Sequence, residues 1–107
     1  DTVQFKTATT YTAGVNGIRL NWSGGAGNPI TYDGTSWGGG ARCILTTANV
    51  AESSGFSDNN AARSNLTFTG LNLRDIGGYA DSDPIWGTTN AVTSPPKGTG
   101  IDLEGAG

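Results

Sequence analysis

The residues that could do chemistry in this 107-residue chain are mainly carboxylates, because the sequence contains no histidine. Without an imidazole, neither a Ser-His-Asp nor a Cys-His mechanism is possible. Asp81 and Asp83 could point the same way from a strand, but Pro84 follows directly, and Asp-x-Asp-Pro is typical of a turn. We therefore expect no catalytic residue and no enzymatic activity.

Two oxygen-rich segments could hold calcium, which takes its oxygen ligands from loops. They are Asp58-Asn59-Asn60 and Asp81-Ser82-Asp83. Neither fits the twelve-residue calcium loop with its closing Glu, so turn or capping roles are the preferred interpretation. The glycine clusters at 24–27 and 38–40 lack the Gly-Lys-Ser/Thr of a phosphate-binding loop and a following helix. We expect neither a metal nor a cofactor.

The single cysteine, Cys43, lies in an apolar run and is expected to be a buried small hydrophobe. The six cations are scattered, which argues against nucleic acid as a partner. No stretch approaches the roughly 20 apolar residues of a membrane-spanning helix. A net charge of −3, with only 14% charged residues among many Thr, Ser, Asn and Gly, is typical of extracellular surfaces. The chain is therefore predicted to be exported.

Aromatic residues beside turns are the side chains best suited to recognition. Rings on loops can stack on sugars or fill pockets on a protein partner, although they can also form a satellite core under the loops. Together with the apolar residues near the C-terminal end, they make up the predicted partner interface: Tyr32, Trp37, Tyr79, Trp86, Ile101 and Leu103.

The elements that must position these residues are short strands. Ile18, Leu20 and Trp22 alternate with polar residues, and the preceding Asn16-Gly17 favours a hairpin between residues 8–12 and 18–23. Further strands are expected at 2–6, 29–33, 43–45 and 66–73, the last with either a bulge or a break at Gly70. No internal repeat is evident. The prediction is one mainly β domain over 1–107: an antiparallel sheet with long Gly-rich loops, little helix, and an extended C-terminal segment at 94–107.

The apolar content is low for a domain of this size. Only 35% of the residues are hydrophobic, 18 are glycines, and one cysteine cannot form an internal disulfide. Small domains with so little apolar mass commonly rely on disulfides, metals or a partner. By elimination, the composition favours a domain that neighbouring chains stabilise.

Two stretches carry a resemblance to a known family: Gly17-Ile18-Arg19-Leu20-Asn21-Trp22 through Trp37, and Asp83-Pro84-Ile85-Trp86 through Glu104. In these the chain resembles the second domain of geopilins, separately encoded globular chains that complete a split type IV pilin. The resemblance implies a β-rich head that pairs with a short helical pilin chain as a heterodimer. It also implies neighbouring copies in a filament that passes the periplasm and reaches the cell surface. A usual pilin head has a C-terminal disulfide loop, which one cysteine cannot make.

The leading hypothesis is therefore a structural subunit of an extracellular filament. A capsid decoration or fibre domain of a virus would share the same composition and the same need for neighbours. A carbohydrate-binding module using Tyr32, Trp37 and Trp86 is the third alternative.

Overall fold

The computed structural model describes residues 1–48, 50, 53–58, 60–77 and 99–103. Within these ranges the chain forms nine short strands and no helix, so the prediction of a mainly β fold is confirmed. No helix that could cross a membrane occurs among these residues. The strands are β1 (Thr2–Lys6), β2 (Thr10–Thr12), β3 (Ile18–Arg19), β4 (Ile30–Trp37), β5 (Ile44–Thr46), β6 (Ser54–Ser57), β7 (Leu66–Thr69), β8 (Asn72–Arg74) and β9 (Thr99–Asp102).

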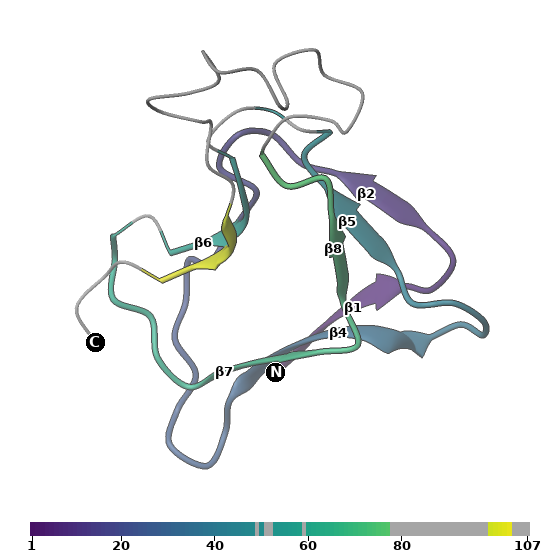
Figure 1. The fold of residues 1–107 in the computed structure, drawn as a ribbon. Helices are drawn as coiled ribbons and strands as arrows, with labels where there is room; N and C mark the ends of the chain where they lie inside the picture. Colours follow the sequence, from purple (N-terminus) through teal and green to yellow (C-terminus); the bar gives the residue numbers. More distant parts are fainter. Residues whose placement is uncertain (49, 51–52, 59, 78–98, 104–107) are drawn as a thin grey trace, which may run out of the picture.

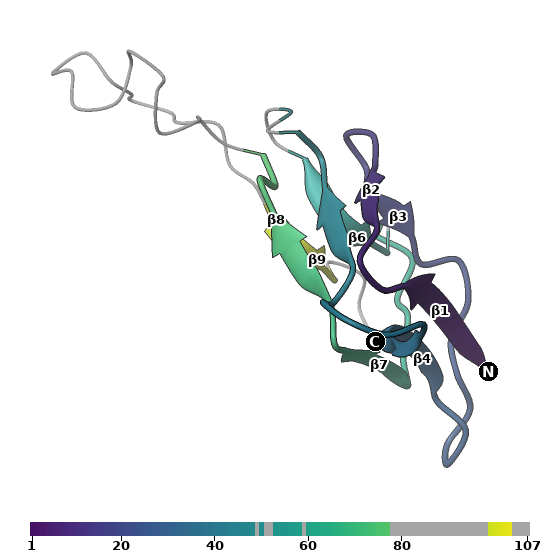
Figure 2. The ribbon, with the colours of Figure 1, turned by 90° about the vertical axis from the view of Figure 1, so that its right-hand side faces the viewer.

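The strands form three parallel sheets of three strands each. Their orders are β1-β4-β7, β2-β5-β8 and β3-β6-β9. Each turn of the chain thus contributes one strand to every sheet, and the next turn lies beside it. Viewed along the stack the sheets enclose a three-sided interior (Figure 1), and from the side the turns lie next to one another (Figure 2). The fold is a β-helix of three coils, which we number one to three in chain order.

The prediction of an antiparallel sheet is wrong, because every strand pair within the sheets is parallel. The expected hairpin is also absent: Thr10–Thr12 pair with Ile44–Thr46, and Ile18–Arg19 pair with Phe56 and Ser57. A turn does form at Gly17, whose N–H bonds to Gly14 O at 2.9 Å. It turns the chain from one sheet into the next instead of folding it back on itself.

Gly70 ends one strand and lets the next begin in a different sheet. Its φ of +63° lies in the left-handed region, which glycine adopts without steric cost. The phase slip between Phe68 and Leu71 therefore marks a corner between β7 and β8, and the break is the correct one of the two predicted alternatives. The predicted 29–33 strand extends further than expected, through Asp33-Gly34 to Trp37.

The core consists of side chains stacked in columns from coil to coil. Tyr32 stacks on Phe68 at a ring-centroid distance of 5.3 Å, and the two rings are nearly parallel at 14°. Phe56 meets Tyr32, Phe68 and Phe5 edge-on at 5.5, 5.1 and 6.2 Å. Three columns follow the strand registers: Val3-Tyr32-Phe68, Tyr11-Leu45-Leu73 and Ile18-Phe56-Ile101.

The coils enclose unequal lengths of chain. In the sheet β1-β4-β7, Thr2 pairs with Thr31 and Thr31 with Thr67, whereas in the sheet β3-β6-β9, Ile18 pairs with Phe56 and Phe56 with Ile101. The number of residues between paired positions therefore differs from coil to coil and from sheet to sheet. A fixed sequence period is therefore missing although the structure repeats. Most of the predicted extended segment 94–107 lies outside the described residues, and Thr99–Asp102 within it form β9.

Candidate functional site

The two ends of the stack differ from the middle because nothing within the described residues pairs with their outer strand edges. We call the outer side of coil one, with β1, β2 and β3, the first-coil end. The outer side of coil three, with β7, β8 and β9, is the third-coil end. Unpaired strand edges carry free backbone donors and acceptors, which can template pairing with another chain. These two surfaces are the candidate sites.

The first-coil end exposes apolar side chains around a pocket. Val3 is 42% exposed and Trp22, just after β3, is 74% exposed. Both line a pocket of about 720 Å³. Its remaining lining residues come from the start of β1, the connection between β3 and β4, and β4 itself: Asp1, Ser23, Gly24, Gly25, Asn28, Ile30 and Tyr32.

The connection that carries Trp22 is held by hydrogen bonds to the connection between β6 and β7. Gly24 N donates to Ser64 O at 3.0 Å, and Asn65 Nδ2 donates to Gly24 O at 3.1 Å. A Cβ on Gly24 would lie 2.4 Å from Asn65 O, so this approach requires glycine. The loop around Trp22 is thus anchored at its start, while the indole remains exposed.

The third-coil end exposes the C-terminal apolar pair that the sequence predicted as a partner surface. Ile101 is 37% exposed on β9, and Leu103 directly after the strand is 51% exposed. Ile101 continues the column of Ile18 and Phe56, so its position is fixed by the β6–β9 register. Asp102 beside it receives a hydrogen bond from Ser54 Oγ to Oδ2 at 3.4 Å.

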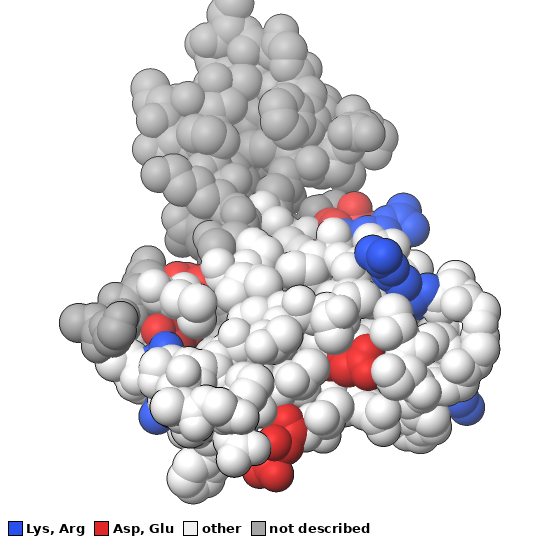
Figure 3. Space-filling model, turned by 90° about the horizontal axis from the view of Figure 1, so that it is seen from below, with Lys and Arg blue, Asp and Glu red and all other residues white. Residues whose placement is uncertain are grey.

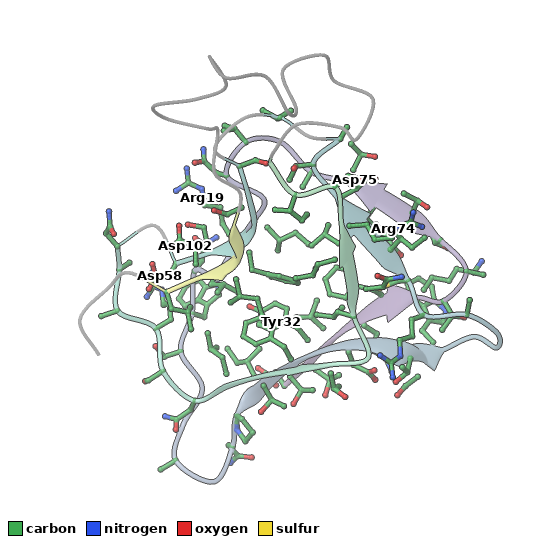
Figure 4. The ribbon with its side chains drawn as sticks, in the orientation of Figure 1. Arg19, Tyr32, Asp58, Arg74, Asp75 and Asp102 are labelled. Carbon is green, nitrogen blue, oxygen red and sulfur yellow. The ribbon has the colours of Figure 1, made fainter. Side chains whose placement is uncertain are left out.

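Of the aromatic residues in the predicted interface, Tyr32 and Trp37 lie within the described residues. Tyr32 is only 6% exposed and stacks in the core, where it also contributes to the lining of the first-coil pocket, and burial raises the pKa of its hydroxyl. Figure 4 shows Tyr32 pointing into the interior of the coil. Trp37 ends β4 and is 52% exposed. Tyr79 and Trp86 lie outside the described residues.

The carboxylates of the described residues serve local structure. Asp33 Oδ1 accepts hydrogen bonds from the N–H and the hydroxyl of Thr35, each at 2.8 Å. Hydrogen bonds from Ser36 and Thr35 hold the pKa of Asp33 at about 2. Asp58 is buried, and its Oδ1 accepts the Asn60 N–H at 2.9 Å. Both carboxylates thus satisfy backbone donors in a turn.

Neither candidate calcium segment gains support as a metal site. Asn59 and the whole 81–83 segment lie outside the described residues. Within the described ranges no group of three or more His, Cys, Asp or Glu side chains could hold an ion.

The lone thiol is enclosed by coils two and three. Cys43 has no exposed surface, and its N–H bonds to Gly34 O at 3.4 Å. Burial is the largest cause that raises the pKa of the thiol. Cys43 therefore behaves as the buried small hydrophobe that the sequence predicted.

Charge is sparse on the side of the β1-β4-β7 sheet. Seen from below, this face shows mostly uncharged residues with a few separated acidic and basic ones (Figure 3). The outward positions along the sheet are largely threonine, since Thr2, Thr31 and Thr67 share one register position. The described part of this face offers no basic stripe that would track phosphates.

Comparisons with family models, with curated proteins and with solved structures gave no match for this chain. The resemblance to the second domain of geopilins therefore remains a prediction. What the chain does has to be inferred from its own surfaces.

Sequence reasoning missed two residues of the first-coil end: Val3 and Trp22. Val3 and Trp22 both belong to alternating patterns, which marked them as buried. Alternation identifies the inward side of a strand, but it cannot tell an end coil from a middle coil. That distinction needs the strand order.

Proposed function

We propose that this chain is a non-catalytic structural module of an extracellular filament, in which neighbouring polypeptides cover the ends of the β-helix. One observation supports this most directly. The inward columns extend to both end coils, so Val3 and Ile101 are substantially exposed, whereas Tyr32 and Phe56 in coil two are buried. Repeat folds of this kind bury a column only where a further repeat covers it.

The edge strands add a second argument. β1 and β7 are the outer strands of their sheet, and within the described residues no further strand pairs with the outer edge of either. Natural proteins usually cover, shorten or charge such edges, because an open edge pairs readily with another strand. A neighbouring strand at either end would satisfy these groups and cover the apolar side chains at the same time.

The shortage of internal stabilisation supports the same function. Six hydrophobic residues are buried among the described residues: Phe5, Leu20, Tyr32, Cys43, Leu45 and Phe56. A core this small leaves a narrow margin over the conformational entropy of the chain. Contacts at the ends would bury additional apolar surface and so stabilise this small domain.

Self-association and stability test this function. In sedimentation and denaturation experiments on the whole chain, we expect assembly to rise with concentration and the unfolding midpoint to rise with it. Ile101→Asp should weaken assembly, because it places a charge in the covered surface. The matched control is Val50→Asp, which adds the same charge at an exposed position between β5 and β6 of coil two.

A chain that stays monomeric over the whole accessible concentration range, with the same unfolding midpoint throughout, contradicts the proposal. Equal weakening of assembly by both substitutions would assign the effect to net charge and would also count against the proposal.

A second candidate function is carbohydrate binding at the first-coil pocket. The supporting observation is that the strongly exposed Trp22 lines the pocket together with Ser23 and Asn28. An aromatic face beside hydroxyl and amide groups suits an uncharged sugar ring, which has an apolar face and a polar rim. This site shares Tyr32 with the predicted one, but its exposed aromatic residue is Trp22, and Trp37 does not line it.

Titration with neutral oligosaccharides, followed by tryptophan fluorescence, tests this candidate. Trp22→Ala should abolish any binding, and Trp37→Ala should leave it unchanged, because Trp37 does not line the pocket. Absence of binding across a broad panel, or equal loss in both variants, would remove this candidate.

A further inference from the structure

The filament proposal leaves open which polypeptide covers the ends, and the registers identify a specific neighbour. We infer that the neighbour is a second copy of this chain, stacked head-to-tail so that coil one of one copy lies on coil three of the next. This inference rests on the proposed function. It assigns the partner, the orientation and the register of the contact.

The apolar columns begin and end with apolar residues. A second copy on the third-coil end, in the register of the existing sheets, would extend every column without placing a polar side chain inside it. The new contacts would join Phe68 to Val3, Leu73 to Tyr11 and Ile101 to Ile18 of the next copy. Both partly exposed end residues, Val3 and Ile101, would then be covered from their open side.

The charges of one outward column favour this orientation. Arg19, Ser57 and Asp102 share a register position across β3, β6 and β9. Arg19 is on coil one and Asp102 on coil three, so the column has opposite charges at its two ends. Figure 4 shows both residues on the outer side of the β3-β6-β9 sheet. Head-to-tail stacking would bring Asp102 beside Arg19 of the next copy, at the strand spacing of about 4.8 Å.

Other arrangements of two copies lack this complementarity. A contact between two third-coil ends that aligned the β3-β6-β9 sheets would bring the Asp102 carboxylates toward each other, and the same contact between two first-coil ends would bring the Arg19 side chains together. Like charges across an interface are costly. A head-to-tail contact is also heterologous and does not close on itself when the copies follow one axis, so repeating it gives a fibre.

Charge reversal tests the pairing. Asp102→Arg and Arg19→Asp should each weaken self-association about tenfold or more, because each creates a like-charge pair at the contact. The double variant Arg19→Asp with Asp102→Arg should return the dissociation constant to within about threefold of the original, since the pair is restored in reverse. Arg74→Glu is the control: its column, Thr12-Thr46-Arg74, carries no charge at the other end.

Cysteine cross-linking tests the orientation. In one chain carrying both Arg19→Cys and Asp102→Cys, a strand separates the two positions, so their Cα atoms lie roughly 9.6 Å apart at the usual spacing. That exceeds the reach of an internal disulfide. Mild oxidation should therefore produce a ladder of covalent multimers on a denaturing gel, whereas either single variant should stay monomeric on the gel, because its cysteine faces Asp102 or Arg19 of the next copy. The native Cys43 is buried and should not contribute.

The outcomes separate the two proposals. Absence of any concentration-dependent association overturns both the structural function and this contact. Association that persists without rescue by the double variant, or without a multimer ladder, overturns the head-to-tail contact and leaves the structural function standing. Rescue together with the ladder supports both.

Discussion

At the scale of single residues, the close stacking of coils explains several of the glycines. Gly34 in β4 lies against the Gly70 corner of coil three, and Gly55 in β6 lies against Gly100 in β9. A Cβ on Gly55 would stand 2.6 Å from Gly100 O, which is closer than real contacts allow. These glycines are therefore packing residues that allow neighbouring coils to approach closely.

Gly34→Ala should destabilise the fold. Its Cβ would lie 2.5 Å from Gly70 O and 2.8 Å from Cys43 Sγ, and neither neighbour can move without disturbing a coil. We expect a loss of about 1–3 kcal/mol in the free energy of unfolding, measured by urea denaturation. Gly39→Ala is the control, because nothing lies within 4 Å of its added Cβ. A loss of the same size at Gly39 would show that general loop effects, and not coil packing, dominate.

Asp33 should make the fold sensitive to acid. Its folded pKa of about 2 is below the ordinary value of 3.8, so the folded state favours the ionised carboxylate. The resulting stabilisation is complete above the ordinary pKa and is lost as the pH falls from about 4 toward about 2. Asp33→Asn should flatten this part of the stability profile, measured by urea unfolding at pH 5, 4, 3 and 2. An unchanged slope in the variant would assign the acid sensitivity to other carboxylates.

Cys43 should resist thiol reagents while the chain is folded. The side chain is buried and its raised pKa disfavours the reactive thiolate. We expect little reaction with a chromogenic disulfide reagent at neutral pH and one full equivalent in denaturant. Rapid reaction of the native chain would mean that coils two and three separate readily.

At the scale of elements, short strands are stable here because each is paired on at least one side and contributes side chains to the interior. β3 has only two residues, yet it pairs with β6 and contributes Ile18 to a column. The strand positions were largely predictable, since alternation reports which side chains face inward. The pairing of the strands was not predictable, because an Asn16-Gly17 turn can form a corner between two sheets of a β-helix as well as a hairpin.

Phe56 is the side chain on which coil cohesion depends most. It is fully buried in β6 of coil two and contacts Tyr32, Phe68 and Phe5 edge-on. Phe56→Ala should cost about 3–5 kcal/mol, a large part of the stability of a small domain, with a strong loss in thermal unfolding midpoint. Val50→Ala, at an exposed position, should have little effect. A mild effect of the Phe56 substitution would contradict the column description of the core.

At the scale of the whole molecule, the exposed ends of the stack determine stability and self-association. A repeat fold with few coils has a large share of its surface at its ends, and its stability depends on what covers them. The exposed end residues therefore link the low apolar content of the chain to its proposed assembly.

Dilution should lower the thermal stability of the whole chain. If copies cover one another's ends, the unfolding midpoint measured by calorimetry should rise by several degrees between micromolar and millimolar concentration. The Arg19→Asp and Asp102→Arg double variant should show the same dependence as the original chain. Either single variant should show less. A midpoint independent of concentration in all four proteins would indicate that the ends are stable when exposed.

The sequence by itself determined local properties. It indicated a β-rich chain without histidine chemistry, a buried Cys43, and the inward side of most strands. Composition can be counted directly, and alternation depends only on residues close together in the sequence. It did not determine strand direction, the three-coil repeat, the burial of Tyr32 or the exposure of Val3. Those depend on which distant segments pair, such as Ile18 with Phe56 and Phe56 with Ile101. Unequal connections between coils hide that pairing from any fixed period, so only the tertiary structure decided it.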